Sequence, residues 1–323
     1  MKICVYGAGA VGGHFAVRFA RAGHAVSVVA RGATLAALRD RGLTLVTPSE
    51  RLDARVRAAA DAAELGPQDL VISTLKAQSV IFFARAAAPL IGPATRIVFA
   101  QNGIPWWYGL EAAHGTAPRP DLDFLDPGGE IAARFAHARC YGAVVTSGNT
   151  VIEPGVIDNS TPLNSVPLAP ILARGAADAG HDAAATELRA LFEAAGLRSP
   201  PVADLRLEIW RKLLMNLVTG MTVLTGADTG ISLGDADVRA TAERLADEVA
   251  RIGAAYGMRL QARLPVTPPG KKSSLLQDYE KGRPMEVDAQ FRAPLAFARA
   301  ARLDVPVLET ITHLIAFQAR GRA

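Results

Sequence analysis

The stretch that decides the fold lies at the start of the chain and reads Lys2-Ile3-Cys4-Val5-Tyr6-Gly7-Ala8-Gly9-Ala10-Val11-Gly12-Gly13. An apolar run typical of a buried strand leads directly into a G-x-G-x-x-G turn, and a helical pattern follows. In such a turn the first glycine permits the tight bend, the second lets a pyrophosphate approach the backbone, and the third lets the helix pack against the strand. The N–H groups at the start of that helix bind phosphates. We expect a dinucleotide to contact Gly7, Ala8, Gly9, Ala10, Val11 and Gly12; the alternative is a glycine-rich turn without a ligand.

The second predicted strand indicates which dinucleotide is bound. It covers residues 24–30 and ends in Ala30, where an NAD enzyme usually carries an acid for the ribose 2′-hydroxyl. The next residue, Arg31, can fork onto a 2′-phosphate. These two features favour NADP(H). Lys76, after the apolar run 70–75, is a second candidate cation at the strand edge where nucleotides bind. Either side chain could instead be a solvated loop cation.

Composition limits the class of protein. A chain of 323 residues has room for two domains. Its net charge is +4, and its basic residues are scattered, which does not favour a nucleic-acid partner but suits an anionic cofactor and an acidic substrate. Two cysteines indicate neither a disulfide framework nor a metal site. The start of the chain is itself a strand, and no apolar stretch is long enough to cross a bilayer, so we expect no membrane association and a cytoplasmic location.

The order of periodic segments predicts two domains. Strands are expected near 2–6, 24–30, 69–75, 95–100, 139–147 and 149–158, with helices near 11–22, 34–41, 77–89 and 182–196. This alternation is typical of a doubly wound, Rossmann-type parallel sheet. Residues 114–137 are expected to form an inserted loop. After Ser199-Pro200-Pro201 the pattern is helical only, near 203–225, 235–257, 273–281, 286–303 and 306–319. We therefore expect an α/β dinucleotide-binding domain over 1–200 and an all-α substrate domain over 201–323, with a ligand cleft between them.

The first helix after the break carries a candidate proton donor. Lys212 and Asn216 are four residues apart and share one helix face, among leucines. A partly desolvated lysine has a lowered pKa, which suits a general acid that protonates a carbonyl oxygen as a hydride arrives. The alternative is a surface lysine whose stem lies over apolar side chains.

Three further polar residues are candidates, each with an ordinary structural explanation. Asn102, in Gln101-Asn102-Gly103, follows a predicted strand and could contact a carbonyl oxygen or the nicotinamide amide, or could simply form a turn. Ser274 is expected to be a helix N-cap. Glu286 is expected in the first turn of the next helix, where a carboxylate is favourable without any catalytic role.

Taken together, these motifs resemble the ketopantoate reductase (2-dehydropantoate 2-reductase) family across both predicted domains. They occur in the family's order, as GAGAVGG, TLKA, QNG, ExxWRKxxxN, SSxLQD and a Glu two residues before an Asp. The resemblance implies reduction of ketopantoate to pantoate with NADPH, in pantothenate and coenzyme A biosynthesis. It implies that Lys212 is the general acid and that Glu286 binds the substrate hydroxyl. It further implies that Asn102, Asn216 and Ser274 position the substrate and the lysine. By the same resemblance, the residues that hold NADPH are Gly7, Gly9, Gly12, Arg31 and Lys76.

Two departures leave the substrate open. The family often has a further asparagine four residues after the position of Asn216, and here that residue is Gly220. Trp106 and Trp107 follow QNG and could form an apolar wall for another substrate or pack in the core. The alternatives are reduction of a different branched keto acid and a nucleotide-binding sensor without turnover. The expected partner is a small keto acid, and a homodimer is left open.

Overall fold

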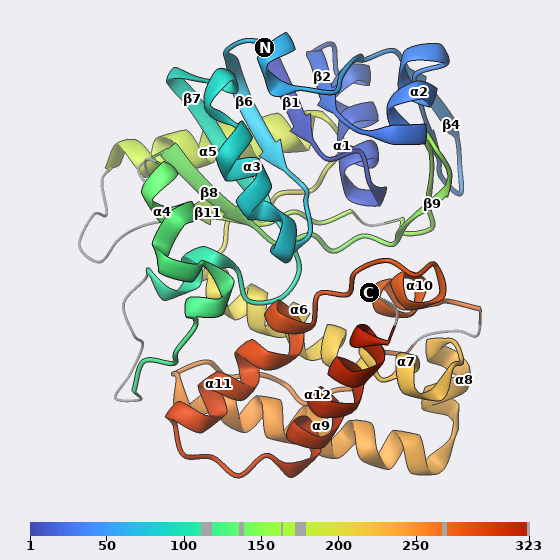
Figure 1. Ribbon diagram of the computed structural model, residues 1–323, viewed down its shortest axis with the longest axis vertical. Coiled ribbons are helices and arrows are strands. Elements are labelled where there is room, and N and C mark those ends of the chain that lie inside the picture. Colours follow the sequence, from blue (N-terminus) through green and yellow to red (C-terminus); the bar gives the residue numbers. More distant parts are fainter. Residues whose placement is uncertain (111–117, 136–138, 163, 172–178, 267–269, 322–323) are drawn as a thin grey trace. The chain divides into compact units, whose positions relative to one another are not determined.

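The chain folds into two compact units. The computed structural model describes residues 1–110, 118–135, 139–162, 164–171, 179–266 and 270–321. The first unit comprises residues 1–101 and 129–205, and the second comprises 102–128 and 206–323 (Figure 1). The sequence predicts a single division at residue 200, whereas in the structure residues 102–128 already belong to the helical unit. The physical reason is local: the N–H of Ile104 donates to the carbonyl of Ala289 at 2.8 Å, and Nε1 of Trp210 donates to the hydroxyl of Tyr108 at 2.8 Å.

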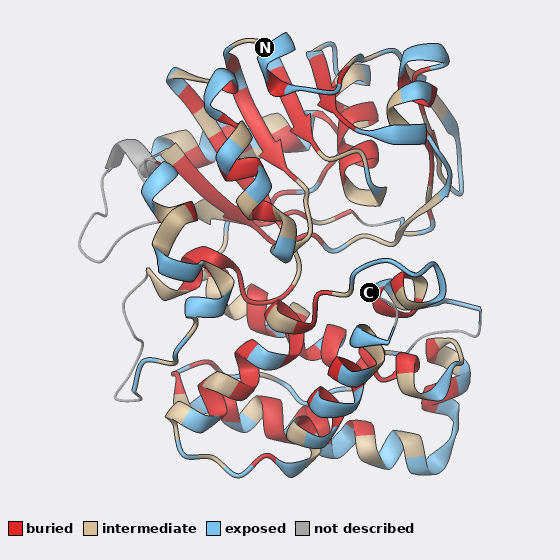
Figure 2. Cartoon of the chain, in the orientation of Figure 1, coloured by how far each residue is buried: buried red, intermediate tan, exposed pale blue. Residues whose placement is uncertain are grey.

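A seven-stranded sheet forms the centre of the first unit, in the order β11-β8-β7-β6-β1-β2-β5. Its neighbouring strands pair in parallel, except β11, which is antiparallel to β8. The strands are β1 Lys2–Tyr6, β2 Ala25–Val29, β5 Arg57–Ala59, β6 Gln68–Ser73, β7 Ile91–Ala100, β8 Cys140–Ala143 and β11 Leu168–Pro170. The strands are mostly apolar and buried (Figure 2). This is typical of parallel sheets, because helices cover both of their faces. This confirms the predicted Rossmann-type architecture.

A second, four-stranded sheet in the first unit was not expected from the sequence. Its order is β4-β3-β10-β9, with β3 Leu43–Val46, β4 Arg51–Ala54, β9 Asn149–Glu153 and β10 Val156–Asn159. The single strand expected at 149–158 is a hairpin, because Gly155 adopts φ +84° and reverses the chain. Strand β4 contains charged residues and is only partly buried, so its sequence does not have the pattern of a core strand.

The helices of the first unit are α1 Ala10–Arg21, α2 Gly32–Asp40, α3 Val80–Ala86, α4 Glu130–Arg134 and α5 Ala179–Ala194. Helix α4 lies in the segment predicted as an inserted loop. Its first residue, Glu130, forms ion pairs with Arg85 at 2.7 Å and with Arg134 at 3.0 Å. The parts of that predicted loop at 114–117 and 136–137 lie outside the described residues.

Helices and connecting segments make up the described residues of the second unit, without strands. Its helices are α6 Leu205–Gly220, α7 Thr222–Thr225, α8 Thr229–Gly234, α9 Ala236–Ala255, α10 Ser274–Glu280, α11 Ala293–Ala300 and α12 Pro306–Arg320. Its core contains an aromatic cluster in which the rings of Tyr108, Trp210 and Tyr256 surround Phe297, with centroids 4.8–5.4 Å away. Because Tyr108 is part of this cluster, the segment after β7 is a structural part of the helical unit.

Candidate active site

The glycine turn between β1 and α1 has the geometry of a phosphate-binding loop. Gly7 adopts φ +104°, a conformation that other residues rarely take. A Cβ on Gly12 would lie 1.9 Å from the carbonyl oxygen of Gly7, so only glycine permits this approach of helix to turn. At Gly9 the direction of a Cβ is open, with no atom within 4 Å, and no described side chain caps α1. An open backbone at an uncapped helix start fits a pyrophosphate.

Two candidate cations follow strands that flank β1. Thr74, just after β6, donates from its hydroxyl to the carbonyl of Gly7 at 2.8 Å, which ties β6 to the turn. Lys76 comes two residues later and is half-buried. Arg31 is the N-cap residue of α2, two residues after β2, and is exposed. Burial raises the pKa of the Tyr6 hydroxyl, and the positive charge of the nearby Arg31 acts in the opposite direction. Both cations therefore lie at the carboxyl edge of the sheet, where dinucleotides bind.

Helix α6 carries the candidate proton donor. Lys212 is half-buried, and the neighbouring residues Leu213 and Leu217 of this helix are buried. Burial lowers the pKa of Lys212, and the ammonium of Lys271 lowers it further. One turn along, Asn216 is only 9% exposed, and its Nδ2 is buried without a hydrogen-bond partner in the described part of the chain. An unpaired buried amide next to a desolvated lysine is costly unless a ligand pairs with it.

The candidate carboxylate, Glu286, accepts a hydrogen bond from a residue that the sequence interpretation did not single out. Glu286 is 6% exposed, and its Oε2 accepts a hydrogen bond from Nε2 of Gln290 at 3.2 Å. Glu286 precedes the helix rather than lying in its first turn, and a π-helical stretch at Asp288–Arg292 leads into α11. The spacing of four between Glu286 and Gln290 was the available signal. Such wide turns often occur at functional sites.

Ser274 is not the N-cap of α10. The cap is Ser273, whose hydroxyl accepts from the N–H of Leu276 at 3.1 Å, and Ser274 is the first helical residue. The side chain of Ser274 is exposed and is therefore available to a ligand. The correction follows from one residue of register, because two consecutive serines offer the same capping group.

The two departures noted in the sequence have different structural outcomes. A Cβ on Gly220 would lie 2.7 Å from Cζ of Phe291 and 3.4 Å from Cδ2 of Leu275, so apolar side chains occupy the space that a larger residue would need. Trp106 and Trp107 are 5% and 2% exposed. They pack inside the helical unit and do not present an open wall.

The candidate residues divide between the units. The glycine turn, Arg31 and Lys76 lie in the first unit, whereas Asn102, Lys212, Asn216, Ser274 and Glu286 lie in the second. Asn102 follows the end of β7 by two residues and is half-buried. Cys4 and Cys140 are buried free thiols, and burial raises the pKa of each to about 12, which makes them unreactive. The described residues contain neither a group of side chains suited to a metal ion nor a helix able to cross a membrane.

Comparisons with known proteins support one family. The family described as Ketopantoate reductase PanE/ApbA matches residues 3–166, and its C-terminal counterpart matches residues 204–319. A 2-dehydropantoate 2-reductase of Mesorhizobium japonicum is 36% identical over 323 residues, which cover 98% of this chain and 97% of the relative. A protein of the same description from Caulobacter vibrioides is 28% identical over 299 residues, covering 90% and 89%.

Solved structures share the fold over nearly the whole chain. A protein from Ralstonia solanacearum MolK2, whose crystal structure is described as that of a “putative ketopantoate reductase”, is 32% identical in sequence. Its TM-score is 0.83, and the match covers 99% of this chain and 98% of that one. A D-mandelate dehydrogenase in complex with NADH and anilino(oxo)acetate has a TM-score of 0.82 with coverage of 99% of both chains, but at 18% identity this likeness concerns the fold alone. The two matched regions together with the full-length relative show that the chain belongs to the ketopantoate reductase family of NADP-dependent oxidoreductases.

Proposed function

We propose that this chain reduces ketopantoate to pantoate with NADPH, and that Lys212 is its general acid. The observation that carries the proposal is the environment of Lys212, where burial lowers the pKa of a lysine one turn from an unpaired, buried asparagine amide. A lysine in water holds its proton too tightly to be an efficient acid near neutral pH, and desolvation reduces that mismatch. In pantothenate biosynthesis this reaction would supply pantoate.

The first unit supplies the cofactor site in this proposal. The backbone of Gly7–Gly12 would hold the pyrophosphate, with Gly9 offering open space to it. Arg31 would pair with the 2′-phosphate, and Lys76 would add a second cation. Bound NADPH supplies a hydride to the keto carbon. Position 30 is alanine rather than an acidic residue, so no carboxylate there would repel the 2′-phosphate.

The second unit supplies the groups that act on the keto acid. Lys212 would donate its proton to the oxygen of the keto group as that oxygen becomes an alkoxide, and the amide of Asn216 would orient the substrate or the lysine. Glu286 would accept a hydrogen bond from the substrate hydroxyl, with Gln290 holding the carboxylate in place. Asn102 and Ser274 would contact the substrate, and Asn102 could also contact the nicotinamide amide. Each of these groups is a donor or acceptor that suits a hydroxylated keto acid.

One observation favours a second candidate, reduction of a branched 2-keto acid with fewer polar groups. Gly220 has no side chain to donate a hydrogen bond, and Phe291 and Leu275 fill the space beside it. A site with an apolar wall at this position discriminates weakly between a substrate with a hydroxyl and one without it.

A matched pair of substrates separates the two candidates. Ketopantoate and 3,3-dimethyl-2-oxobutanoate differ only in the hydroxyl group, and turnover of each is followed by the loss of NADPH absorbance. Our proposal expects kcat/KM to favour ketopantoate by at least about tenfold, as the loss of one hydrogen bond to a charged group implies. An equal or reversed preference would support the second candidate. Tight NADPH binding without turnover of any keto acid would indicate a sensor and would contradict both.

A further inference from the structure

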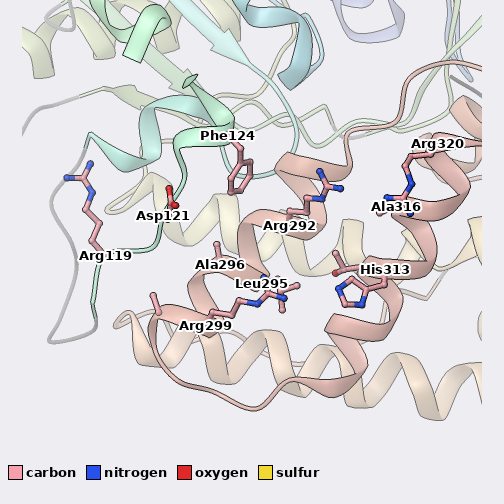
Figure 3. A pocket seen from close by; sticks show the side chains of 12 residues that line it. Arg119, Asp121, Phe124, Arg292, Leu295, Ala296, Arg299, His313, Ala316 and Arg320 are labelled. Carbon is pink, nitrogen blue, oxygen red and sulfur yellow. The ribbon is translucent and has the colours of Figure 1, made fainter. Parts of the chain in front are cut away.

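A cavity of about 740 Å³ opens within the second unit, on a part of the molecule that the proposed reaction does not use. It lies between α11, α12 and the segment from Arg119 to Phe124 (Figure 3). Its lining includes none of the residues assigned above to substrate or cofactor. A volume of this size is typical of sites for small organic ligands.

Apolar residues, several of them alanines, form one part of the cavity lining, which we call the floor. Ala296 and Ala300 are one turn apart on α11, and Ala316 lies on α12. Leu295 and the ring of Phe124 extend the apolar surface (Figure 3). Alanines at these positions leave space that larger side chains would fill, so the cavity is a consequence of the sequence of both helices.

The rim of the cavity is cationic. Four arginines are among the lining residues, Arg119, Arg292, Arg299 and Arg320, against the single lining acid Asp121. Arg292 and Arg299 form ion pairs at 2.8 Å with Asp288 and Glu309, neither of which lines the cavity. Within the described part of the chain, Arg119 and Arg320 have no ion-pair partner. The rim therefore has an excess of positive charge, and in the described part of the chain Arg320 has no carboxylate partner that would compete with a ligand.

We propose that this cavity binds a small amphipathic anion, with a carboxylate or phosphate head on an apolar body. Guanidinium groups pair in a planar, bidentate manner with both kinds of head group. The alanine floor would accommodate the apolar body, which gains affinity by leaving water. A purely inorganic anion would leave the floor unused, and a neutral apolar molecule would leave the rim unpaired.

The proposal is tested by isothermal titration of the full-length protein with hexyl phosphate and with hexanoate. Inorganic phosphate and 1-hexanol serve as ligands that carry only one of the two features. We expect saturable binding of one hexyl phosphate or hexanoate per chain, at least about tenfold tighter than either single-feature ligand. Such binding of either ligand supports the site. The ligand that binds more tightly identifies the head group, phosphate or carboxylate, that the site prefers.

Three variants assign that binding to the cavity. Arg320→Gln removes one rim charge, and Ala296→Phe fills the floor while leaving the arginines in place; we expect each to weaken binding about tenfold. Arg239→Gln, at an exposed arginine of α9 outside the cavity, is the matched control and should change affinity by less than about twofold. Keto-acid reduction without hexyl phosphate should be the same in all three.

Several results would overturn the proposal. These are no saturable binding, inorganic phosphate binding as tightly as hexyl phosphate, or equal losses in Arg239→Gln and Arg320→Gln. Sedimentation provides a further check: if the wild-type chain is a dimer that dissociates in both Arg320→Gln and Ala296→Phe, the cavity belongs to a contact with a second copy of the chain.

Discussion

Helices α1 and α6 each carry a basic side chain that burial disfavours in its charged form, but the two helices place that side chain very differently. His14 on α1 is fully buried, both of its ring nitrogens lack a described partner, and burial lowers its pKa to about 3. Lys212 on α6 is only half-buried and lies one turn from the unpaired amide of Asn216. A basic group sealed in the core remains neutral and serves packing, whereas one at the edge of the core can exchange a proton with a ligand.

The comparison extends to the units that contain these helices. The first unit offers a dinucleotide mainly backbone, with glycines at Gly7, Gly9 and Gly12. The second unit offers side chains, with Lys212 and Glu286 as titratable groups near or in its core. If this division is right, substitutions in the first unit should change the fold or cofactor affinity, and substitutions in the second should change the rate of reduction and its pH dependence.

The largest expected effect in the first unit is at the glycine turn. Gly12→Ala places a methyl group 1.9 Å from the carbonyl oxygen of Gly7, and the backbone must move to accommodate it. We expect a loss of about 3 kcal/mol or more in the free energy of unfolding, measured by urea denaturation. Gly9→Ala is the matched control, because its methyl group meets no atom within 4 Å. That variant should keep its stability but bind NADPH more weakly, and similar stability in the two variants would contradict the turn geometry.

The next effect concerns the choice of cofactor. Arg31→Ala should weaken NADPH by about tenfold or more, because a charge-assisted pair with the 2′-phosphate is lost, and should leave NADH nearly unchanged. Fluorescence titration with each nucleotide measures this, with Arg21→Ala, at an exposed arginine in the last turn of α1, as control. Equal losses for both nucleotides would show that Arg31 does not contact the 2′-phosphate.

His14 should make the protein sensitive to acid. Its pKa is about 3 in the folded chain and near its ordinary value of 6.5 when unfolded, so below that value the unfolded state binds the extra proton. Stability should therefore fall as the pH decreases from about 6.5 toward 3, by up to about 1.4 kcal/mol per pH unit. His14→Leu should remove this part of the slope in urea titrations, and His313→Gln, at an exposed histidine, should not. An unchanged slope in His14→Leu would mean that His14 finds a partner.

The smallest effect concerns the environment of Lys212. A general acid acts in its protonated form, so kcat/KM should fall as the pH rises through the pKa of Lys212, earlier than for an ordinary lysine. Lys271→Gln removes a nearby cation that lowers this pKa, and should shift the alkaline limb of the profile to higher pH. Lys281→Gln, at another exposed lysine of the second unit, is the control. A limb that stays in place would show that another group titrates there.

Local patterns predicted much of the first unit. The alternation of strands and helices, the glycine turn and the positions of Arg31 and Lys76 depend on neighbours along the chain, and the architecture is as expected. The sheet formed by β3, β4, β9 and β10 was missed because its strands are short and its central pair, β3 with β10, joins residues more than 100 positions apart. The assignment of residues 102–128 to the helical unit depends on partners such as Trp210 and Ala289, which spacing cannot reveal.

The candidate site was predictable in residue identity more than in arrangement. Lys212, Asn216 and Glu286 came from spacing and family pattern, and their roles remain predictions. The contact between Gln290 and Glu286 follows their spacing of four, but no sequence signal indicated the π-helical stretch that contains Gln290. The space at Gly220 is filled by Phe291, which lies on another element 71 residues away. Register also mattered, because Ser273 rather than Ser274 caps α10.

The most direct test of the central claim is a single-turnover measurement of hydride transfer by the Lys212→Ala enzyme, together with its dissociation constant for NADPH. Loss of the general acid should slow NADPH oxidation on mixing with ketopantoate by about 10²–10⁴-fold and leave NADPH affinity unchanged. Lys212→Arg should be nearly as slow, since a guanidinium does not release its proton near neutral pH. A Lys212→Ala rate within about threefold of wild type would contradict the account, because Lys212 would then be a surface lysine of α6 whose stem only covers apolar side chains.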